Sequence, residues 1–246
     1  MPTAVKTYQR EMHTTTGFFA TWLPGDPIDI GDVGVFEGGR FRKMSSFQEL
    51  KIKYSKVRGK SFQSVDYSSR RGTKIATSMS TEAATLGNAE ITIHFSREGA
   101  FVFQALKMQS WELENRKAVS DKIVEAFHKK VWDKSWMWVE SLHTADRATI
   151  VISEEKAAEL VLTAKLNETL PSVSLVNPNV SLSVASFRGK MIRLIGSPNL
   201  HPLYSCLRLK VPRLLGKPSP KPVRGAKRAA TDVDVSRPGI DELLES

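Results

Sequence analysis

Alternation between apolar and polar side chains is clearest in the segment AEITIHF, residues 89–95. Its odd-numbered positions are apolar and its even-numbered positions are polar, which is typical of a strand with one buried face. SREGA then supplies a turn at residues 96–100, and FVFQALKM at residues 101–108 is predicted to be the returning strand. The pattern therefore predicts a β-hairpin over residues 89–108 that covers a core in the resting protein.

Further segments have strand character. VGVF and RFRKM flank EGG at residues 37–39, which indicates a second hairpin. SFQSVDYSS and KIATSMST stand on either side of RRG, which predicts a turn. The later strand-like runs are SWMWVESL, ATIVIS, AELVLTAKL, NVSLSVASF, KMIRLIG and HPLYSCLRLKV. No internal repeat is evident among them.

Two segments have the period of an amphipathic helix. Apolar side chains recur three or four positions apart over residues 5–19, and four apolar side chains stand four positions apart over residues 119–131. Ser46 with Glu49 three residues later forms a capping box that predicts one short helical turn. Together with the strands, these helices predict an α+β fold: a twisted, mainly antiparallel β-sheet with packed helices and a short disordered C-terminal tail.

Composition changes after Val211. Residues 212–246 contain five prolines and six basic residues before the first acid. We therefore expect a folded domain over residues 1–211 and a flexible Pro/Lys/Arg-rich tail over residues 212–246. The terminal IDELLES is predicted to form a helical turn, either on a partner or on the protein's own body.

Charge adds a functional indication. The 246 residues are 41% apolar, enough for a substantial core, and carry a formal net charge of +10. With a pI of about 9.7, the balance favours an acidic partner, either nucleic acid or an anionic membrane surface. Between Arg40 and Lys74 there are 11 Lys and Arg residues against two acids. The basic residues that we expect to bind an acidic partner are Arg40, Arg42, Lys43, Lys51, Lys53, Lys56, Arg58 and Lys60.

Catalytic chemistry has no support in the sequence. There is no P-loop, no G-x-S-x-G nucleophile elbow and no His-Glu-x-x-His motif. The histidines fall on separate predicted elements: His13, His94, His128, His143 and His201. Asp26, Asp29 and Asp32 lack the spacing and terminal glutamate of an EF-hand, so we interpret them as turn residues. We expect no enzyme activity, no metal and no cofactor.

The lone Cys206 excludes an internal disulfide and favours a reducing compartment, where we expect it to be a small buried residue. No apolar run approaches the roughly 18 residues of a membrane-spanning helix, and the first residues carry charges where a signal peptide would be apolar. We therefore expect a soluble intracellular chain that meets a membrane only conditionally.

Read in order, the elements run helix, hairpin, short helix, Ser/Thr-rich and basic strands, amphipathic hairpin, helix and another strand group. This order resembles the pore-forming domain of gasdermins, particularly the compact ones of bacteria and fungi. VGVFEGGRFRKMSSFQELKI is similar to the early hairpin and short helix of that domain. WMWVESLHTADRATIVIS resembles the long strand before its second membrane hairpin, and IRLIGSPNLHPLYSCLRL resembles the closing strand pair. The likeness spans residues 5–211 and concerns order and pattern, without a strict motif.

The resemblance implies a conditional pore former in cell death and immunity, cytoplasmic at rest and active at the inner plasma membrane. It would bind acidic phospholipids, oligomerise with its own copies and insert two hairpins, near Phe62–Phe103 and Arg147–Leu166, into a β-barrel. Arg70, Arg71 and Lys74 would lie at a hairpin tip. The implied membrane-hairpin residues are Phe62, Val65, Ile91, Ile93, Phe95, Phe101, Phe103, Ile150, Ile152, Leu160 and Leu162.

Two departures from the gasdermin pattern bear on activation. Bacterial gasdermins usually carry a lipid-modified cysteine near the N-terminus, and the first ten residues here have none. Residues 212–246 stand where mammalian relatives have a large inhibitory domain. Three alternatives are open: cleavage within this tail releases the domain, the tail is inert, or the chain is a tail-independent member that a partner protein activates. The rival class is a soluble basic binding module for nucleic acid or a protein partner. Phe41, Tyr54, Phe62 and Tyr67, interleaved with the basic residues, would suit the nucleic-acid form.

Overall fold

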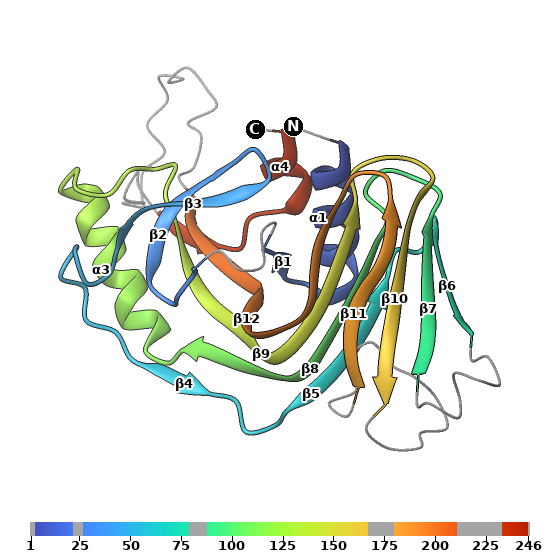
Figure 1. Ribbon diagram of the computed structural model, residues 1–246. Helices are drawn as coiled ribbons and strands as arrows, with labels where there is room; N and C mark the ends of the chain where they lie inside the picture. Colours follow the sequence, from blue (N-terminus) through green and yellow to red (C-terminus); the bar gives the residue numbers. More distant parts are fainter. Residues whose placement is uncertain (1–2, 22–26, 79–87, 167–179, 211–232, 246) are drawn as a thin grey trace.

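A nine-stranded sheet and a four-stranded sheet make up most of the computed structural model of the protein (Figure 1). The structure describes residues 3–21, 27–78, 88–166, 180–210 and 233–245. Every strand pair within these ranges is antiparallel. Together with the helices packed against the sheets, this confirms the predicted α+β class.

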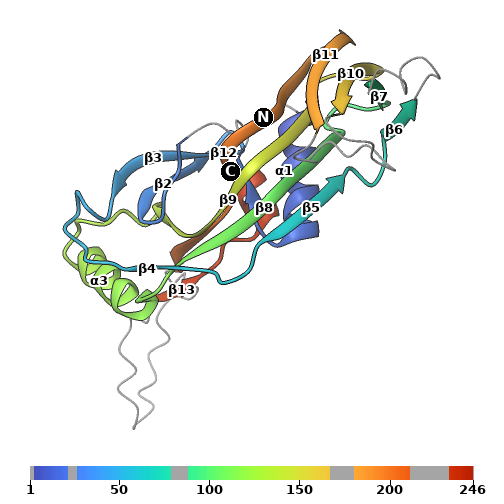
Figure 2. The same ribbon diagram turned by 60° about the horizontal axis from the view of Figure 1, so that its bottom comes forward.

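The nine-stranded sheet is built around β8 (Phe101–Leu113), β9 (Met137–Ser153) and β12 (Met191–Lys210). β9 pairs with both β8 and β12, and Figure 2 shows the three strands running through the length of the molecule. β9 and β12 are the longest described strands, and each contains two strand-like runs that the sequence pattern predicts as separate strands. The shorter strands of this sheet are β1 (Phe19–Ala20), β2 (Asp32–Glu37), β3 (Arg40–Ser46), β4 (Lys56–Arg58), β5 (Gln63–Ser68) and β13 (Asp234–Ser236).

The four-stranded sheet has the order β11–β10–β7–β6. Its strands are β6 (Thr73–Ser78), β7 (Asn88–Phe95), β10 (Ala158–Leu166) and β11 (Val180–Arg188). The apolar side chains of β7 and β10 form one cluster with Ala100, Val102 and Val151 of the larger sheet. The alternation in AEITIHF therefore reflects a sheet that buries one face against another sheet.

The predicted hairpin over residues 89–108 is wrong in its pairing. β7 pairs with β6 and β10, whereas β8 pairs with β4, β5 and β9. SREGA is thus a corner between two sheets. Sequence period could not distinguish a corner from a hairpin turn, because both join two strands that have apolar faces.

Each corner instead belongs to a bent two-stranded ribbon. In the first ribbon β5 continues into β6 and β7 into β8, with β5 paired to β8 and β6 to β7. In the second, β9 continues into β10 and β11 into β12, with β9 paired to β12 and β10 to β11. The two membrane hairpins placed near Phe62–Phe103 and Arg147–Leu166 fall on these two ribbons.

All four strands of the ribbons bend at a residue with a positive φ angle. These residues are Gly72 at 92°, Gly99 at 78°, Ala157 at 59° and Gly189 at 89°. Left-handed backbone redirects the chain sharply and suits glycine, whereas at Ala157 it carries a steric cost. The two ribbons therefore fold over at corners that bring the smaller sheet onto the larger one.

Helix α1 (Thr3–Thr16) covers the other face of β8 and β9 (Figure 2). Its Tyr8 and Met12 are fully buried in a cluster with the side chains of β8 and β9 that point away from the smaller sheet. Helix α3 (Arg116–His128) buries Val119 and Ile123 in a third cluster. Both helices lie where the apolar period predicts them, and the EGG hairpin is confirmed as β2 and β3.

The C-terminal segment corrects one expectation. Residues 233–245 are folded: β13 pairs with β12, and helix α4 (Ile240–Glu245) adds Ile240, Leu243 and Leu244 to the core. α4 lies beside α1 (Figure 1), so IDELLES forms its helical turn on the protein's own body. Proline and charge content predicted a flexible tail over all of residues 212–246, whereas residues 233–245 pack through a short apolar stripe. Residues 212–232 of the predicted tail lie outside the described ranges.

Candidate functional site

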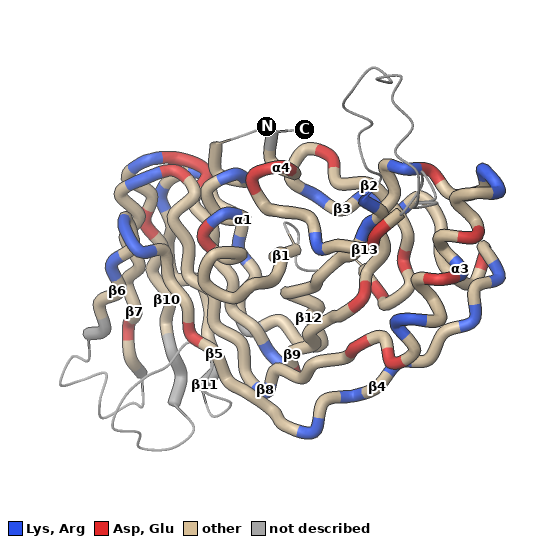
Figure 3. The backbone as a smooth tube through the Cα atoms, turned by 180° about the vertical axis from the view of Figure 1, so that it is seen from behind, with Lys and Arg blue, Asp and Glu red and all other residues tan. Residues whose placement is uncertain are grey.

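The basic residues singled out from the sequence are all exposed. Arg40, Arg42 and Lys43 lie on β3, whereas Lys56 and Arg58 lie on β4. Lys51 and Lys53 occupy the connection between these strands, and Lys60 follows β4. Because β3 pairs with β2 while β4 pairs with β8, the basic segment spans two separate margins of the larger sheet (Figures 1 and 3).

Some of this positive charge is neutralised within the protein. Lys43 Nζ lies 2.6 Å from Oδ1 of Asp32, a buried carboxylate, and this hydrogen bond raises the pKa of Lys43. Two exposed pairs join Lys56 to Asp29 at 3.2 Å and Arg42 to Glu37 at 3.0 Å. Among the residues that the structure describes, Lys51, Lys53 and Lys60 have no ion-pair partner. These three carry the charge most available to an acidic partner.

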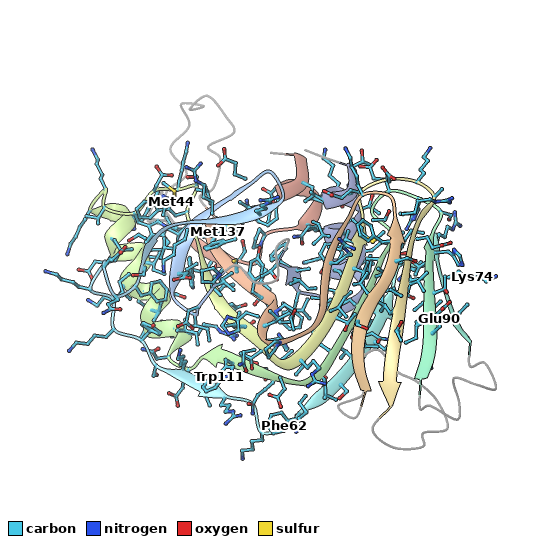
Figure 4. All side chains as sticks on the ribbon, in the orientation of Figure 1. Met44, Phe62, Lys74, Glu90, Trp111 and Met137 are labelled. Atoms are coloured by element: carbon cyan, nitrogen blue, oxygen red, sulfur yellow. The ribbon has the colours of Figure 1, made fainter. Side chains whose placement is uncertain are left out.

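Aromatic rings accompany the basic side chains of β4. The Arg58 guanidinium lies 5.5 Å from the ring centroid of Trp111 and 5.7 Å from that of Phe62. Lys56 Nζ is 5.9 Å from the Trp111 centroid. Phe62 is 54% exposed and lies at the outer margin of the molecule (Figure 4). β4 therefore presents cations together with apolar surface.

The residues assigned to membrane hairpins form two buried groups. One faces the interior from the smaller sheet: Ile91, Ile93, Phe95, Leu160 and Leu162. The other lies on β8 and β9 under α1: Phe101, Phe103, Ile150 and Ile152. Val65 packs at the margin of the second group, whereas Phe62 is exposed. In this state the two apolar faces cover a core, as expected for the resting protein.

α1 is attached by polar contacts to the first ribbon's corner. Glu11 forms an ion pair with Arg97, and the backbone N–H of Arg70 donates to Glu11 Oε2 at 3.1 Å. The backbone N–H of Ala4 donates to Glu98 Oε1 at 2.9 Å.

The expectation that Arg70, Arg71 and Lys74 lie at a hairpin tip is wrong, because β5 pairs with β8 and β6 pairs with β7, so β5 and β6 are not paired with each other. The ribbon bends at this point, so these residues lie at its corner.

A buried carboxylate joins distant parts of the chain. Glu140 on β9 is fully buried; its Oε1 accepts a hydrogen bond from Arg237 Nε at 2.9 Å and another from Ser205 Oγ at 3.2 Å. Arg116 Nε of α3 lies 2.9 Å from the other carboxylate oxygen. Sequence reasoning missed this site, although a single acid inside the apolar run WMWVESL was the available signal.

The remaining polar candidates have structural surroundings. The backbone N–H of Asp29 donates to Asp32 Oδ2 at 2.9 Å, which is turn capping as predicted; Asp26 lies outside the described residues. Ser46 and Glu49 form both hydrogen bonds of the capping box, which opens a turn. Cys206 is buried, which raises the pKa of its thiol.

Two further findings concern metals and membrane spans. No group of three or more His, Cys, Asp or Glu in the described ranges is arranged to hold a metal ion. Within those same ranges, no helix has both the length and the hydropathy needed to cross a membrane.

Comparison with known proteins gives the following result. No protein-family model matches the chain, and no curated protein matches it. The structure is similar to that of a bacterial gasdermin from Bradyrhizobium tropiciagri, with 12% identity and a TM-score of 0.36 over 80% of this chain and 84% of that one. It is also similar to the gasdermin A3 membrane pore, with 10% identity and a TM-score of 0.33 over 86% of this chain and 95% of that one.

Both structures are gasdermins, the family that the order of elements resembles.

Proposed function

We propose that this protein is a conditional membrane pore former. The observation that carries the proposal is the pair of bent ribbons, each with one apolar face buried against the rest of the protein. A membrane-spanning strand alternates lipid-facing apolar residues with polar residues that face water. β7 and β10 have this alternation. In a membrane, lipid would replace the rest of the protein as the surface that covers their apolar side chains.

Strand length supports the same proposal. A spanning strand needs about 9–11 residues. β6 has 6 residues, β7 has 8, and β10 and β11 have 9 each, so β6 would have to lengthen by a few residues and the others by fewer. Residues 73–95 and 158–188 are each long enough for two spans and a turn. Straightening the corners would let each ribbon extend as one hairpin without new strand pairing.

The exposed cations would bring the protein to acidic phospholipids. Each Lys or Arg near an anionic leaflet contributes about 1 kcal/mol. Within the described ranges Lys51, Lys53 and Lys60 have no ion-pair partner, and Arg58 lies beside the exposed ring of Phe62, which suits the membrane interface. The protein would be cytoplasmic at rest and would move to the inner face of the plasma membrane when active, as part of cell death or defence.

Open sheet edges support assembly with further copies. In the described pairings β6 pairs only with β7, and β11 only with β10. Each strand therefore leaves one edge with unpaired backbone groups, which favours addition of another strand. Copies joined edge to edge would close into a barrel in which no backbone edge meets lipid.

The C-terminal segment would act as the lock on residues 1–211. α4 packs beside α1, where Arg10 Nε lies 3.0 Å from Asp241 Oδ1, and α1 in turn contacts the first ribbon's corner. Release of α4 would loosen α1 and uncover the apolar side of β8 and β9. Cleavage within 212–232 by a protease, or competition for α4 by a partner protein, would supply that release.

Dye release tests the proposal. A full-length protein with a specific protease site inserted within residues 212–232 would be added to anionic and neutral liposomes, before and after cleavage. We expect release from anionic liposomes only after cleavage. Dye release without cleavage would support pore formation but would exclude a role of the C-terminal segment as a lock. If circular dichroism shows that the cleaved protein is folded and no dye is released, the pore proposal is wrong.

Nucleic-acid binding is the second candidate, favoured by the Arg58–Phe62–Trp111 cluster. Exposed rings beside cations form stacking platforms for single strands. A labelled RNA would then shift with steep salt dependence while liposomes stay intact. Substitution of Phe62→Ala would weaken that shift.

A further inference from the structure

A cavity of about 530 Å³ lies at the corners of both ribbons. It receives residues from the β5–β6 corner, from the end of β7, from the β9–β10 corner and from the end of β11. Those on which the inference depends are Gly72, Lys74, His94, Lys156, Glu159 and Arg188. The cavity therefore exists only while the ribbons are bent together.

Strand register explains why charged side chains meet there. Lys74 is paired with His94, His94 with Glu159, and Glu159 with Arg188. Directly opposed residues on antiparallel strands share a face, with Cβ atoms about 5 Å apart. These four residues therefore form one row across the exposed face, opposite the buried face that carries Ile93 and Leu160 (Figure 4 labels Lys74).

The charged side chains that line this cavity are three cations, Lys74, Lys156 and Arg188, and one carboxylate, Glu159, so the lining carries an excess of positive charge. Glu159 Oε2 lies 2.8 Å from Nδ1 of His94. Within the described part of the chain, Lys74, Lys156 and Arg188 have no ion-pair partner. Three cations, from β6, from the β9–β10 corner and from the end of β11, thus line one concave site.

We propose that this cavity binds a phosphate monoester group. A guanidinium bonds two phosphate oxygens at once, and ammonium groups add point charges. The volume falls within the range of small-ligand sites, so it suits a phosphate carried on a small polyol or headgroup. A phosphate held by Lys74, Lys156 and Arg188 would tie both ribbons together in their bent form. The role of phosphate in holding the ribbons bent rests on the proposed pore function, whereas phosphate binding itself does not.

Calorimetric titration of the full-length protein with inorganic pyrophosphate at low salt tests the soluble source. We expect saturable binding that weakens at least tenfold in Lys156→Gln and in Arg188→Gln. Lys134→Gln, which removes the same charge from the segment after α3, is the matched control and should change affinity less than twofold. Equal weakening in all three variants would overturn the proposal, because it would indicate a non-specific charge effect.

Vesicle binding tests the lipid source. Phosphatidic acid presents a phosphate monoester, whereas phosphatidylglycerol presents a diester, so the two are compared at equal mole fraction. A preference for phosphatidic acid that Lys156→Gln abolishes would assign the site to a headgroup. Pyrophosphate binding without that preference would assign it to a soluble phosphate. If the protein neither binds pyrophosphate nor prefers phosphatidic acid, the proposed site is wrong. Neither experiment depends on pore formation.

Discussion

At the scale of single residues, Glu140 shows how a buried charge is kept. Its carboxylate has no contact with water, while Arg116 and Arg237 approach it from α3 and the C-terminal segment with their side chains partly exposed. Removal of one arginine leaves the other as a counter-ion. Removal of both leaves an uncompensated buried charge, which is far more costly.

We therefore predict strong non-additivity at this site. Arg116→Ala combined with Arg237→Ala should lower the free energy of unfolding by about 3–5 kcal/mol, well beyond the sum of the single changes. Urea denaturation measures the difference. In a Glu140→Gln background the same double change should cost little, and an undiminished loss there would show that the arginines act through other contacts.

Glycine with a positive φ angle is required for two separable reasons, as Gly17 after α1 and Gly99 at the first ribbon's corner show. Gly17 and Gly99 have nearly equal φ angles of 76° and 78°, but a Cβ on Gly17 would meet open space. A Cβ on Gly99 would lie 2.5 Å from Thr7 Cβ on α1.

Gly17→Ala should therefore cost about 1–2 kcal/mol from left-handed backbone alone. Gly99→Ala should cost a further 1–3 kcal/mol or so, because α1 must move away from β8. Denaturation of both variants under the same conditions gives the comparison. If both variants lose the same free energy of unfolding, α1 moves away from Gly99→Ala without an energetic cost.

At the scale of elements, helices and turns could be predicted, but partners could not. The apolar periods of α1 and α3 and the capping box of Ser46 with Glu49 depend on residues a few positions apart, so the sequence shows them directly. The pairing of β7 with β10 and of β8 with β9 joins residues that are 29 to 77 positions apart in the chain. Alternation identified β7 and β10 and the face that each strand buries, but not which strand lies next to it.

α4 provides the prediction at this scale. Leu244 is buried in the core, so Leu244→Asp places a charge in an apolar site and should detach α4. We expect faster hydrogen exchange of α4 amides and at least tenfold faster dye release from anionic liposomes. Asp241→Asn removes only the exposed ion pair with Arg10, which is worth at most about 1 kcal/mol, so it should speed exchange far less than Leu244→Asp. Rapid exchange of α4 without any rise in dye release would exclude its role as a lock.

At the scale of the whole molecule, the net positive charge matters only where it is unpaired. Figure 3 shows basic positions along β4, on α3 and at the corners of the ribbons. On α3, however, Lys117 is paired with Asp121, and both Lys122 and Lys129 with Glu125. A count of basic residues in the sequence could not distinguish these paired lysines from Lys51, Lys53 and Lys60, which have no ion-pair partner among the described residues.

Replacement of Lys51, Lys53 and Lys60 together by Gln should weaken binding to anionic vesicles by about 3 kcal/mol, or roughly 100-fold. Co-sedimentation at low salt measures this change, which added salt should reduce by screening. The matched control replaces Lys117, Lys122 and Lys129 by Gln. A similar loss in the control would show that total charge, and not this segment, sets the affinity.

The sequence by itself determined the local elements, the two-faced character of the strands, the basic segment and the absence of familiar catalytic motifs. Each of these depends on residue type and short spacing. Only the tertiary structure decided that the ribbons bend at four corners, that α4 docks beside α1, and that Lys74, Lys156 and Arg188 surround one cavity. The physical reason is that these features arise from contacts between distant segments, whose free energy depends on which surfaces meet and not on local propensity.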